Sequence, residues 1–442
     1  MVSWIDHAIW WQLYPLGFVG APTRPTTDER TDGIAHRLAR IEGWLDHLLS
    51  LGLNGLALGP VFESSTHGYD TVDHFRIDSR LGDDTDFDHL VYAAHERGIR
   101  VLLDGVFNHV GRAHPAFEAL EQHGAAADTA DMFRVRWDGW QPGDPVQADV
   151  FEGHEQLVAL NHASPAVEDL VAEVMTHWLD RGADGWRLDA AYAVPPAFWS
   201  RVLPRVRSTH PDAWITGEVI QGDLADVVRG STMDSVTQYE LWQGIWHSIA
   251  DVNFFELKHA IERSNALLRT FVPSTFIGNH DVTRIASAVG DLRHLPHAVV
   301  PLFTLAGTPS VYAGDEYAYR GVKEARIGGD DAVRPEFAEH PPSPDSLEDE
   351  ARAAMRLHQE LIALRRRFPW LHDAHSDVVH VSNTSIVIRT ATGSGAVVAA
   401  LHLGDAPADL PAGGASAVVA GAGTVAHGRI TVPPHGWAVL TG

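Results

Sequence analysis

The stretch SPAVEDLVAEVMTHWLDRGADGWRLD, from Ser164 to Asp189, decides the fold that the sequence predicts. Its first part has a cap-type serine, a proline in the first turn and a terminal glycine, which are the start and stop signals of a helix over Ser164–Gly182. The apolar run Ala183–Asp189 follows at once and predicts a strand that ends in an acid. A helix followed by a strand is the repeating unit of a parallel sheet.

The same unit recurs along most of the chain. The predicted strands are Ala8–Phe18, Leu53–Pro60, Ile99–Phe107, Ala183–Asp189, Trp214–Val219, Ser235–Trp242, Thr275–Asn279 and Thr308–Val311. Helical patterns lie between them, for example over His36–Gly52, Asp84–Gly98 and Arg352–Arg367. Eight such units predict an α/β fold, a (β/α)8 TIM barrel.

Two segments fall outside the barrel pattern. Residues 110–162, after the third strand, are rich in Gly, Asp and Trp and predict a short inserted subdomain. After Pro369, short alternating runs separated by Gly, Pro and Asp predict a C-terminal antiparallel β-sandwich domain over residues 370–442. The barrel itself is expected to comprise residues 1–109 and 163–369.

Four acids stand at the ends of apolar runs: Asp104 in LLDGVFNHV, Asp189 in GWRLDA, Glu218 in WITGEV and Asp281 in FIGNHD. In a parallel barrel the C-terminal strand ends bring side chains from distant positions into one pocket. We therefore expect these acids to converge. The sequence predicts an enzyme with an acidic site.

The neighbours of two of these acids suggest different protonation states. Arg187 lies two residues before Asp189, on the same face of the strand, and a guanidinium there would favour the ionised carboxylate. Glu218 has no adjacent cation in the sequence, which favours a protonated general acid. One ionised and one protonated carboxyl make a glycosidase pair. At a separation of about 5 to 5.5 Å they would react through a covalent glycosyl-enzyme with retention of anomeric configuration.

The segments around the four acids occur in the order of the family motifs of the alpha-amylase superfamily, glycoside hydrolase family thirteen, which the chain resembles over nearly its whole length. The matching segments are Asp104–His109, Gly185–Asp189, Gly217–Val219 and Asn279–Asp281, with accessory signatures at Gln12–Pro15, His67–Asp73 and Gly307–Glu316. The resemblance implies that Asp189 is the nucleophile, Glu218 the acid/base and Asp281 a third carboxylate that grips sugar hydroxyls.

The resemblance also implies a set of residues that bind or order the sugar. His109 and His280 would bind hydroxyls, Tyr69 would stack on the ring and Asp70 would order the pocket floor. Arg187, beside Asp189, is a further substrate-binding candidate. For Asp104, structural support and direct substrate contact are both open. Glu240 and Arg284 are further possible cleft residues. Trp137 and Trp140 could stack on sugars, although packing inside the inserted subdomain is favoured.

The flanks GWRLDAAYAVPPAFW (Gly185–Trp199) are similar to cyclomaltodextrinases and neopullulanases. The expected activity is retaining hydrolysis of α-1,4-glucosidic bonds in malto-oligosaccharides or cyclodextrins. A transglycosylase or isomerase of α-glucosides and a non-catalytic sugar-binding homologue are the alternatives. A metal-dependent hydrolase ranks lower, because no His-x-His pair ends the first strand.

Composition limits the partners and cofactors. The chain has no cysteine, so neither a disulfide framework nor a thiolate metal site can form. A net charge of -25 disfavours nucleic acid and anionic membranes but leaves a neutral α-glucan unaffected. The chain shows neither a signal-peptide pattern nor a long apolar run, so a cytoplasmic location is expected. The sequence leaves the oligomeric state open.

A metal is not expected in the site. In secreted amylases the calcium-linked segment has an acid before Leu-Asn, whereas here Val158 and Ala159 precede Leu160 and Asn161. No cofactor is therefore required, and calcium through Asn108 stays possible but not expected.

Overall fold

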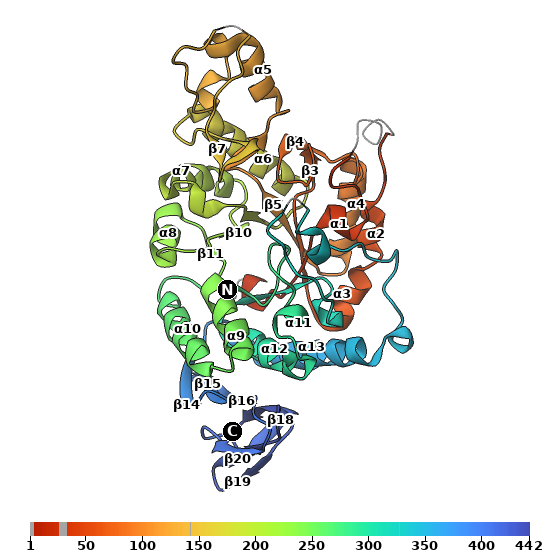
Figure 1. Ribbon diagram of the computed structural model, residues 1–442, viewed down its shortest axis with the longest axis vertical. Coiled ribbons are helices and arrows are strands. Elements are labelled where there is room, and N and C mark those ends of the chain that lie inside the picture. The colour runs from red at the N-terminus through yellow and green to blue at the C-terminus, as the bar shows by residue number, and fades with distance from the viewer. Residues whose placement is uncertain (1–3, 26–32, 142, 327) are drawn as a thin grey trace.

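The computed structural model describes residues 4–25, 33–141, 143–326 and 328–442. Eight parallel strands form one sheet in the order β11-β10-β9-β5-β2-β1-β13-β12 (Figure 1). They are β1 (Trp10–Leu13), β2 (Gly55–Leu58), β5 (Arg100–Gly105), β9 (Gly185–Leu188), β10 (Trp214–Gly217), β11 (Ser235–Val236), β12 (Ser274–Phe276) and β13 (Thr308–Tyr312). A parallel bridge between Thr237 and Ser274 joins the two edges, so the sheet closes into a barrel. The predicted fold class is confirmed.

Helices surround the barrel. They are α1 (Pro15–Phe18), α2 (Leu38–Glu42), α3 (Leu45–Leu51), α4 (Asp84–Glu96), α6 (Pro165–Asp180), α7 (Pro196–Arg207), α8 (Leu224–Ser231), α9 (Tyr239–Ala250), α10 (Phe254–Leu267), α11 (Ile285–Ala288), α12 (Leu295–Thr304) and α13 (Asp349–Arg367). Helix α6 begins as its sequence predicts, because the Ser164 hydroxyl accepts a hydrogen bond from Ala166 N–H at 3.2 Å. None of the helices in the described parts of the chain combines the length and apolar character that a membrane crossing needs.

Three predicted elements differ from the structure. The first strand, expected over Ala8–Phe18, ends at Leu13, because Pro15 begins helix α1. The helix expected over His36–Gly52 is divided into α2 and α3. The sixth strand was expected to run to Trp242, which is wrong, because β11 ends at Val236 and α9 begins at Tyr239. The Gln238 side chain caps α9 by accepting a hydrogen bond from Glu240 N–H at 3.2 Å. The apolar run after Ser235 therefore continues as a helix rather than as a strand.

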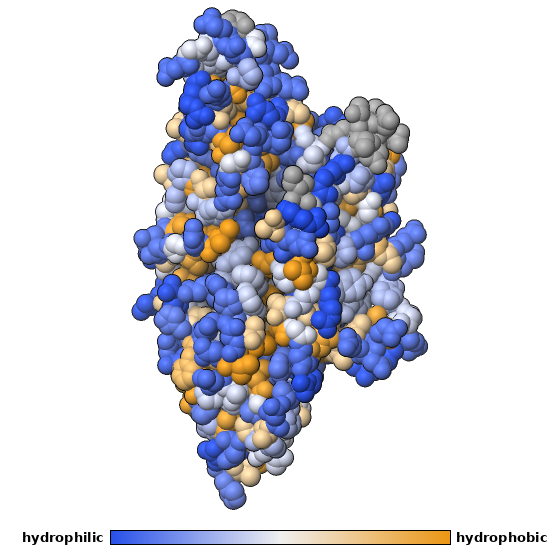
Figure 2. Space-filling model, in the orientation of Figure 1, coloured by the Kyte–Doolittle hydropathy of each residue, from blue (hydrophilic) through white to orange (hydrophobic). Residues whose placement is uncertain are grey.

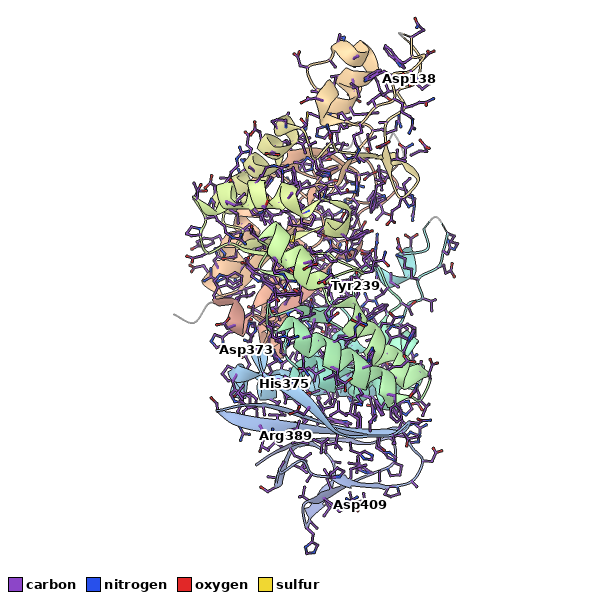
Figure 3. All side chains as sticks on the ribbon, turned by 90° about the vertical axis from the view of Figure 1, so that its left-hand side faces the viewer. Asp138, Tyr239, Asp373, His375, Arg389 and Asp409 are labelled. Atoms are coloured by element: carbon purple, nitrogen blue, oxygen red, sulfur yellow. The ribbon has the colours of Figure 1, made fainter. Side chains whose placement is uncertain are left out.

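The inserted segment after β5 lies at one end of the molecule (Figure 1). It contains β6 (His109–Gly111), α5 (Pro115–His123), β7 (Val150–Phe151) and β8 (His154–Ala159), with the sheet order β6-β8-β7. Trp137 and Trp140 meet edge to face at 5.2 Å, and Trp140 Nε1 donates to Asp144 O. These two rings therefore pack within the segment. Between them Asp138 lies at its far tip (Figure 3).

The C-terminal region forms the opposite end of the molecule, where Asp409 lies (Figures 1 and 3). Its larger sheet contains β14 (His375–Val381), β15 (Ser385–Thr392), β16 (Gly395–His402), β21 (Trp437–Thr441) and β18 (Ala417–Gly421). Its smaller sheet contains β17 (Ala408–Pro411), β20 (Arg429–Val432) and β19 (Thr424–Ala426). Val398 of the larger sheet and Ile430 of the smaller belong to one buried cluster, so the two sheets pack face to face.

Candidate active site

A cavity of about 300 Å³ lies at the C-terminal ends of the barrel strands, beside the inserted segment. It is lined by Tyr69, His109, Phe151, Glu152, Leu157, Asp189, Ala190, Tyr192, Glu218, Ile220, Tyr239, Asp281, Val282 and Lys323. In Figure 2 the surface is hollowed between the inserted segment and the barrel. Asp189, Glu218 and Asp281, from three different strand ends, thus share one cavity, as the sequence predicts.

Arg187 joins the carboxylates beneath this cavity. Its Nη1 lies 2.6 Å from Asp104 Oδ2 and 3.5 Å from Asp189 Oδ1, and its Nη2 lies 2.8 Å from Glu218 Oε1. All four side chains are almost completely buried. One positive charge therefore faces three carboxyl groups in an environment of low polarity.

The charge distribution differs from the sequence-based expectation. Arg187 approaches Glu218 more closely than Asp189, because β10 pairs with β9 and brings Glu218 to the guanidinium. Burial, and then the neighbouring Glu218, raise the pKa of Asp189 well above its ordinary value, and Arg187 only partly opposes them. Arg187 thus lowers the pKa of Asp189, as the sequence predicts, but burial and Glu218 outweigh it and the net shift is upward.

Glu218 is held by three donors. Besides Arg187, the Tyr239 hydroxyl donates to Oε1 at 3.0 Å and Ala190 N–H donates to Oε2 at 3.1 Å. Asn279 Nδ2 in turn donates to the Tyr239 oxygen at 2.9 Å. Sequence reasoning missed Tyr239, because it placed that residue inside a strand.

Asp281 is held as an anion. Arg334 Nη2 lies 2.8 Å from its Oδ1, and His280 Nε2 lies 3.0 Å from its Oδ2. Burial acts to raise the pKa of Asp281, but His280 and Arg334 outweigh it and bring that pKa well below its ordinary value. Arg334 was missed because it comes 53 residues later, in a stretch that shows no motif. Its guanidinium also lies over the Tyr14 ring at 4.7 Å.

The aromatic residues form a stack at one side of the cavity. The Tyr69 ring stacks on His280 with centroids 5.4 Å apart, and its hydroxyl donates to Asp104 Oδ2 at 3.2 Å and also contacts His280 Nε2. His280 is buried between Tyr69 and Tyr14. Tyr69 thus lines the cavity, whereas His280 contacts Asp281 from behind it.

The inserted segment contributes a hairpin tip to the cavity wall. Phe151 stacks on His109 at 4.7 Å with an interplanar angle of 14°. Glu152 Oε1 accepts a hydrogen bond of 2.8 Å from the hydroxyl of Tyr192, which follows the Asp189 strand. Burial lowers the pKa of His109 to about 4, so this imidazole is neutral at neutral pH. The tip is thus held by two contacts, one with the barrel through Tyr192 and one with β6 through His109.

Two predicted site residues act behind the cavity. The Asp104 side chain has no exposed surface and binds Arg187 and Tyr69, contacts that suit structural support, one of its two predicted roles. Asp70 is buried and accepts hydrogen bonds from the Thr66 N–H at 2.9 Å and hydroxyl at 2.6 Å. It therefore orders the loop that carries Tyr69.

Glu240 and Arg284 do not belong to the cavity wall. Glu240 lies on α9 and pairs with Arg263 at 2.6 Å, at the surface. Arg284 is completely buried, with Nη1 2.9 Å from Asp315 Oδ1 and Nη2 donating to Val333 O at 3.0 Å. The interpretation of these two as cleft residues is corrected: a helix turns one outward, and an internal ion pair holds the other.

Arg284→Ala is expected to lower the free energy of unfolding by roughly 3–5 kcal/mol, because it leaves Asp315 buried without its cation. Burial already raises the pKa of Asp315 to about 6. Urea unfolding at neutral pH measures the loss. The control is Arg293→Ala, which removes an exposed ion pair with Asp291 and should have a much smaller effect, because water screens that pair. Equal losses in the two variants would contradict the prediction.

The strand ends of a closed parallel barrel bring together Asp189, Glu218 and Asp281, and Arg187 contacts the first two. This is the arrangement of a glycoside hydrolase site. The family model described as the alpha-amylase catalytic domain matches residues 25–384. The chain belongs to the alpha-amylase family, which confirms the resemblance read from its motifs.

Individual relatives agree with this assignment. A cyclomaltodextrinase from Bacillus sp is 33% identical over 341 residues, 72% of this chain and 60% of that protein. An intracellular maltogenic amylase from Bacillus subtilis is 28% identical over 338 residues, 72% of this chain and 57% of that protein. The chain thus spans about 60% of the length of these curated relatives. Among solved structures, cyclic alpha-maltosyl-(1→6)-maltose hydrolase from Arthrobacter globiformis superposes with a TM-score of 0.82 at 25% identity, covering 100% of this chain and 99% of that one.

Proposed function

We propose that the protein is a retaining α-glycoside hydrolase that cleaves α-1,4-glucosidic bonds of malto-oligosaccharides or cyclodextrins. The observation that carries the proposal is the shared guanidinium of Arg187, which contacts both Asp189 and Glu218 at the floor of one cavity. A shared guanidinium places both carboxyls at one point of the cavity, as the paired acids of a retaining enzyme require for a covalent glycosyl-enzyme. Neutral glucans also suit a chain with a net charge of -25.

The residues divide the chemistry between them. Asp189 attacks the anomeric carbon while Glu218 gives its proton to the departing glycosidic oxygen. Glu218, now ionised, takes a proton from the water that releases the sugar from Asp189. Asp281, kept ionised by Arg334 and His280, accepts hydrogen bonds from sugar hydroxyls and faces the positive charge that develops on the ring.

The site raises the pKa of one reacting carboxyl. Burial, and then the charge of Glu218, bring the pKa of Asp189 well above its ordinary value. Catalysis uses the form with the proton on Glu218 and the charge on Asp189. Because Arg187 contacts both carboxyls, its guanidinium stays beside the negative charge when that charge passes from Asp189 to Glu218 during the reaction.

Two measurements test the proposed function. Proton NMR during early hydrolysis should show the α-anomer as the first product, and the β-anomer would refute retention. Chromatography of products from maltotriose, pullulan, isomaltose and cyclodextrins should show glucose and maltose from α-1,4 substrates. Longer or rearranged glycans would instead identify a transglycosylase or isomerase, and binding without turnover would identify a sugar-binding homologue.

We also propose that the enzyme needs no calcium. In the segment where secreted amylases bind calcium, Val158 and Ala159 stand where an acid would precede Leu160. The Asn161 oxygen that would bind the ion already accepts a hydrogen bond from Ala163 N–H at 3.3 Å. Dialysis against EDTA is expected to change kcat by less than about 10% and the melting temperature by less than about 2 °C. Removal of a resident ion would lower both values, because the folded state would lose the free energy of binding it. A fall in both values that added calcium reverses would contradict this.

A cytoplasmic location is proposed as well. Its support is the relative named an intracellular maltogenic amylase. Fractionation of cells that produce the protein, with activity measured in culture medium and lysate, tests it.

A further inference from the structure

The two oxygens of the Glu218 carboxyl have different surroundings. Oε1 faces two donors, Arg187 Nη2 at 2.8 Å and the Tyr239 hydroxyl at 3.0 Å. Among the described residues, Oε2 accepts one hydrogen bond, from Ala190 N–H at 3.1 Å. With two donors pointing at it, Oε1 has no free lone pair for a proton, whereas Oε2 keeps one.

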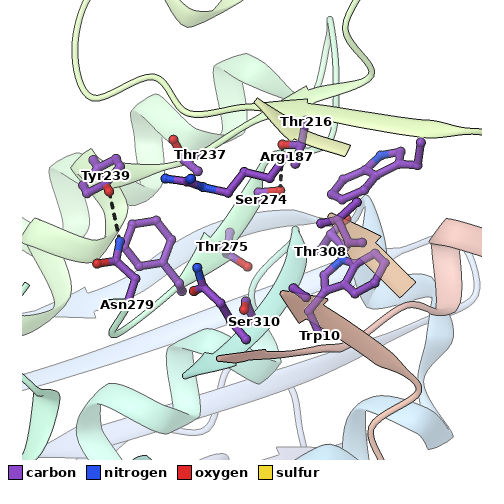
Figure 4. A pocket seen from close by; sticks show the side chains of 15 residues that line it. Trp10, Arg187, Thr216, Thr237, Tyr239, Ser274, Thr275, Asn279, Thr308 and Ser310 are labelled. Carbon is purple, nitrogen blue, oxygen red and sulfur yellow. Dashed lines mark hydrogen bonds between the residues drawn. The ribbon is translucent and has the colours of Figure 1, made fainter. Parts of the chain in front are cut away.

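Asn279 fixes the direction in which the Tyr239 hydroxyl points. Its Oδ1 accepts a hydrogen bond of 2.8 Å from Asp281 N–H, so its Nδ2 faces the Tyr239 oxygen, 2.9 Å away (Figure 4). The phenol oxygen accepts that bond and has a single proton to give. That proton is therefore donated to Glu218.

The surroundings preserve this arrangement. Tyr239 and Asn279 are 9% and 6% exposed and both line an internal cavity of about 60 Å³ inside the barrel, together with Arg187. Burial, and then the charge of Glu218, raise the pKa of Tyr239 well above its ordinary value. The phenol thus remains a donor throughout the pH range in which a glycosidase works.

We propose that Tyr239, oriented by Asn279, is a positioning residue that confines the transferable proton of the acid/base to Glu218 Oε2. In the first step the Oε2 proton passes to the glycosidic oxygen as the bond from that oxygen to the anomeric carbon breaks and a bond from Asp189 forms. In the second step Oε2 takes a proton from water as that ester breaks. Oε1 remains an acceptor of hydrogen bonds throughout. This inference rests on the proposed glycosidase function.

Tyr239→Phe is expected to reduce kcat/KM for maltotriose roughly 10- to 100-fold, the effect of one hydrogen bond to a charged group. Turnover of α-maltosyl fluoride, whose leaving group needs no protonation, should change less than about 3-fold. The alkaline limb of the maltotriose pH profile should move to higher pH, because the ionised carboxylate loses a donor. A purely structural defect would reduce turnover of both substrates equally.

Asn279→Asp provides a second variant that keeps the phenol. A carboxylate there accepts the Tyr239 proton and withdraws it from Glu218, so the same loss confined to maltotriose is expected. The matched control is Tyr312→Phe, which removes another buried hydroxyl, one that donates to Val333 O at 2.8 Å. It should leave the turnover of both substrates unchanged.

The results distinguish failure of the Tyr239 positioning role from failure of the glycosidase function. The positioning role is overturned if Tyr239→Phe reduces the turnover of both substrates equally, or does not reduce the turnover of maltotriose. The glycosidase function still stands in that case, provided that the wild type hydrolyses maltotriose. A wild type that turns over neither maltotriose nor α-maltosyl fluoride overturns the proposed function itself.

Discussion

Asp189→Asn is expected to reduce turnover of malto-oligosaccharides by about 10⁴-fold or more, because an amide cannot form the glycosyl-enzyme bond. A factor of that size corresponds to about 5.5 kcal/mol of transition-state stabilisation. Release of reducing sugar from maltotriose measures it. Unlike loss of the acid/base, loss of the nucleophile should affect substrates with good and poor leaving groups alike.

The same substitution is expected to stabilise the fold. An unfolded chain ionises Asp189 near pH 3.9, whereas burial holds its pKa well above that value in the folded protein. Between these values the folded state binds more protons, so the free energy of unfolding falls as pH rises. Asparagine carries no charge and removes this penalty. Thermal unfolding should therefore show a melting temperature above that of the wild type, by an increment that grows from pH 4 to pH 7.

Asp138→Asn serves as the control for both measurements. Asp138 is exposed at the tip of the inserted segment, far from the barrel (Figure 3), and its replacement should change neither activity nor stability. An Asp189→Asn variant that retained a tenth of wild-type activity would remove Asp189 from the nucleophile role. A variant less stable than the wild type at pH 7 would refute the charge argument.

Glu218→Gln is expected to reduce kcat for maltotriose by about 10²- to 10⁴-fold, the usual contribution of general acid–base catalysis. The glutamine oxygen can still accept from Arg187 and Tyr239, so the fold and the position of the side chain should persist. Circular dichroism and the melting temperature check this. Turnover of α-maltosyl fluoride should suffer less in the first step, because fluoride leaves without a proton.

Glu240→Gln is the matched control, because Glu240 lies near Glu218 in sequence but pairs with Arg263 at the surface. It should retain full activity. Hydrolysis of both maltotriose and an aryl α-maltoside by Glu218→Gln at the wild-type rate would refute the acid/base role.

The barrel and its three acids could be predicted from sequence because both depend on local pattern. Each of Asp189, Glu218 and Asp281 follows an apolar run closely, and parallel strand ends meet at one edge. The antiparallel C-terminal sheets were likewise indicated by alternating runs such as Ser385–Thr392.

The electrostatics of the site could not be predicted, because neighbours in space need not be neighbours in sequence. Arg187 lies two residues before Asp189 in the chain yet is closer to Glu218, which the adjacent strand supplies. Arg334 reaches Asp281 from a loop without a recognisable pattern. Tyr239 escaped notice because the apolar run after Ser235 suits a strand and a helix equally, and the Gln238 cap decides between them.

The doubly attached hairpin tip has a consequence for affinity. Two contacts fix the wall of the cleft before substrate binds: the stack of Phe151 on His109 and the hydrogen bond from Tyr192 to Glu152. The conformational entropy of ordering that wall is therefore lost during folding. A small glucan can then bind the preorganised surface without a further entropic penalty from the loop. Cutting either attachment should weaken substrate binding chiefly through a less favourable entropy, which calorimetry resolves.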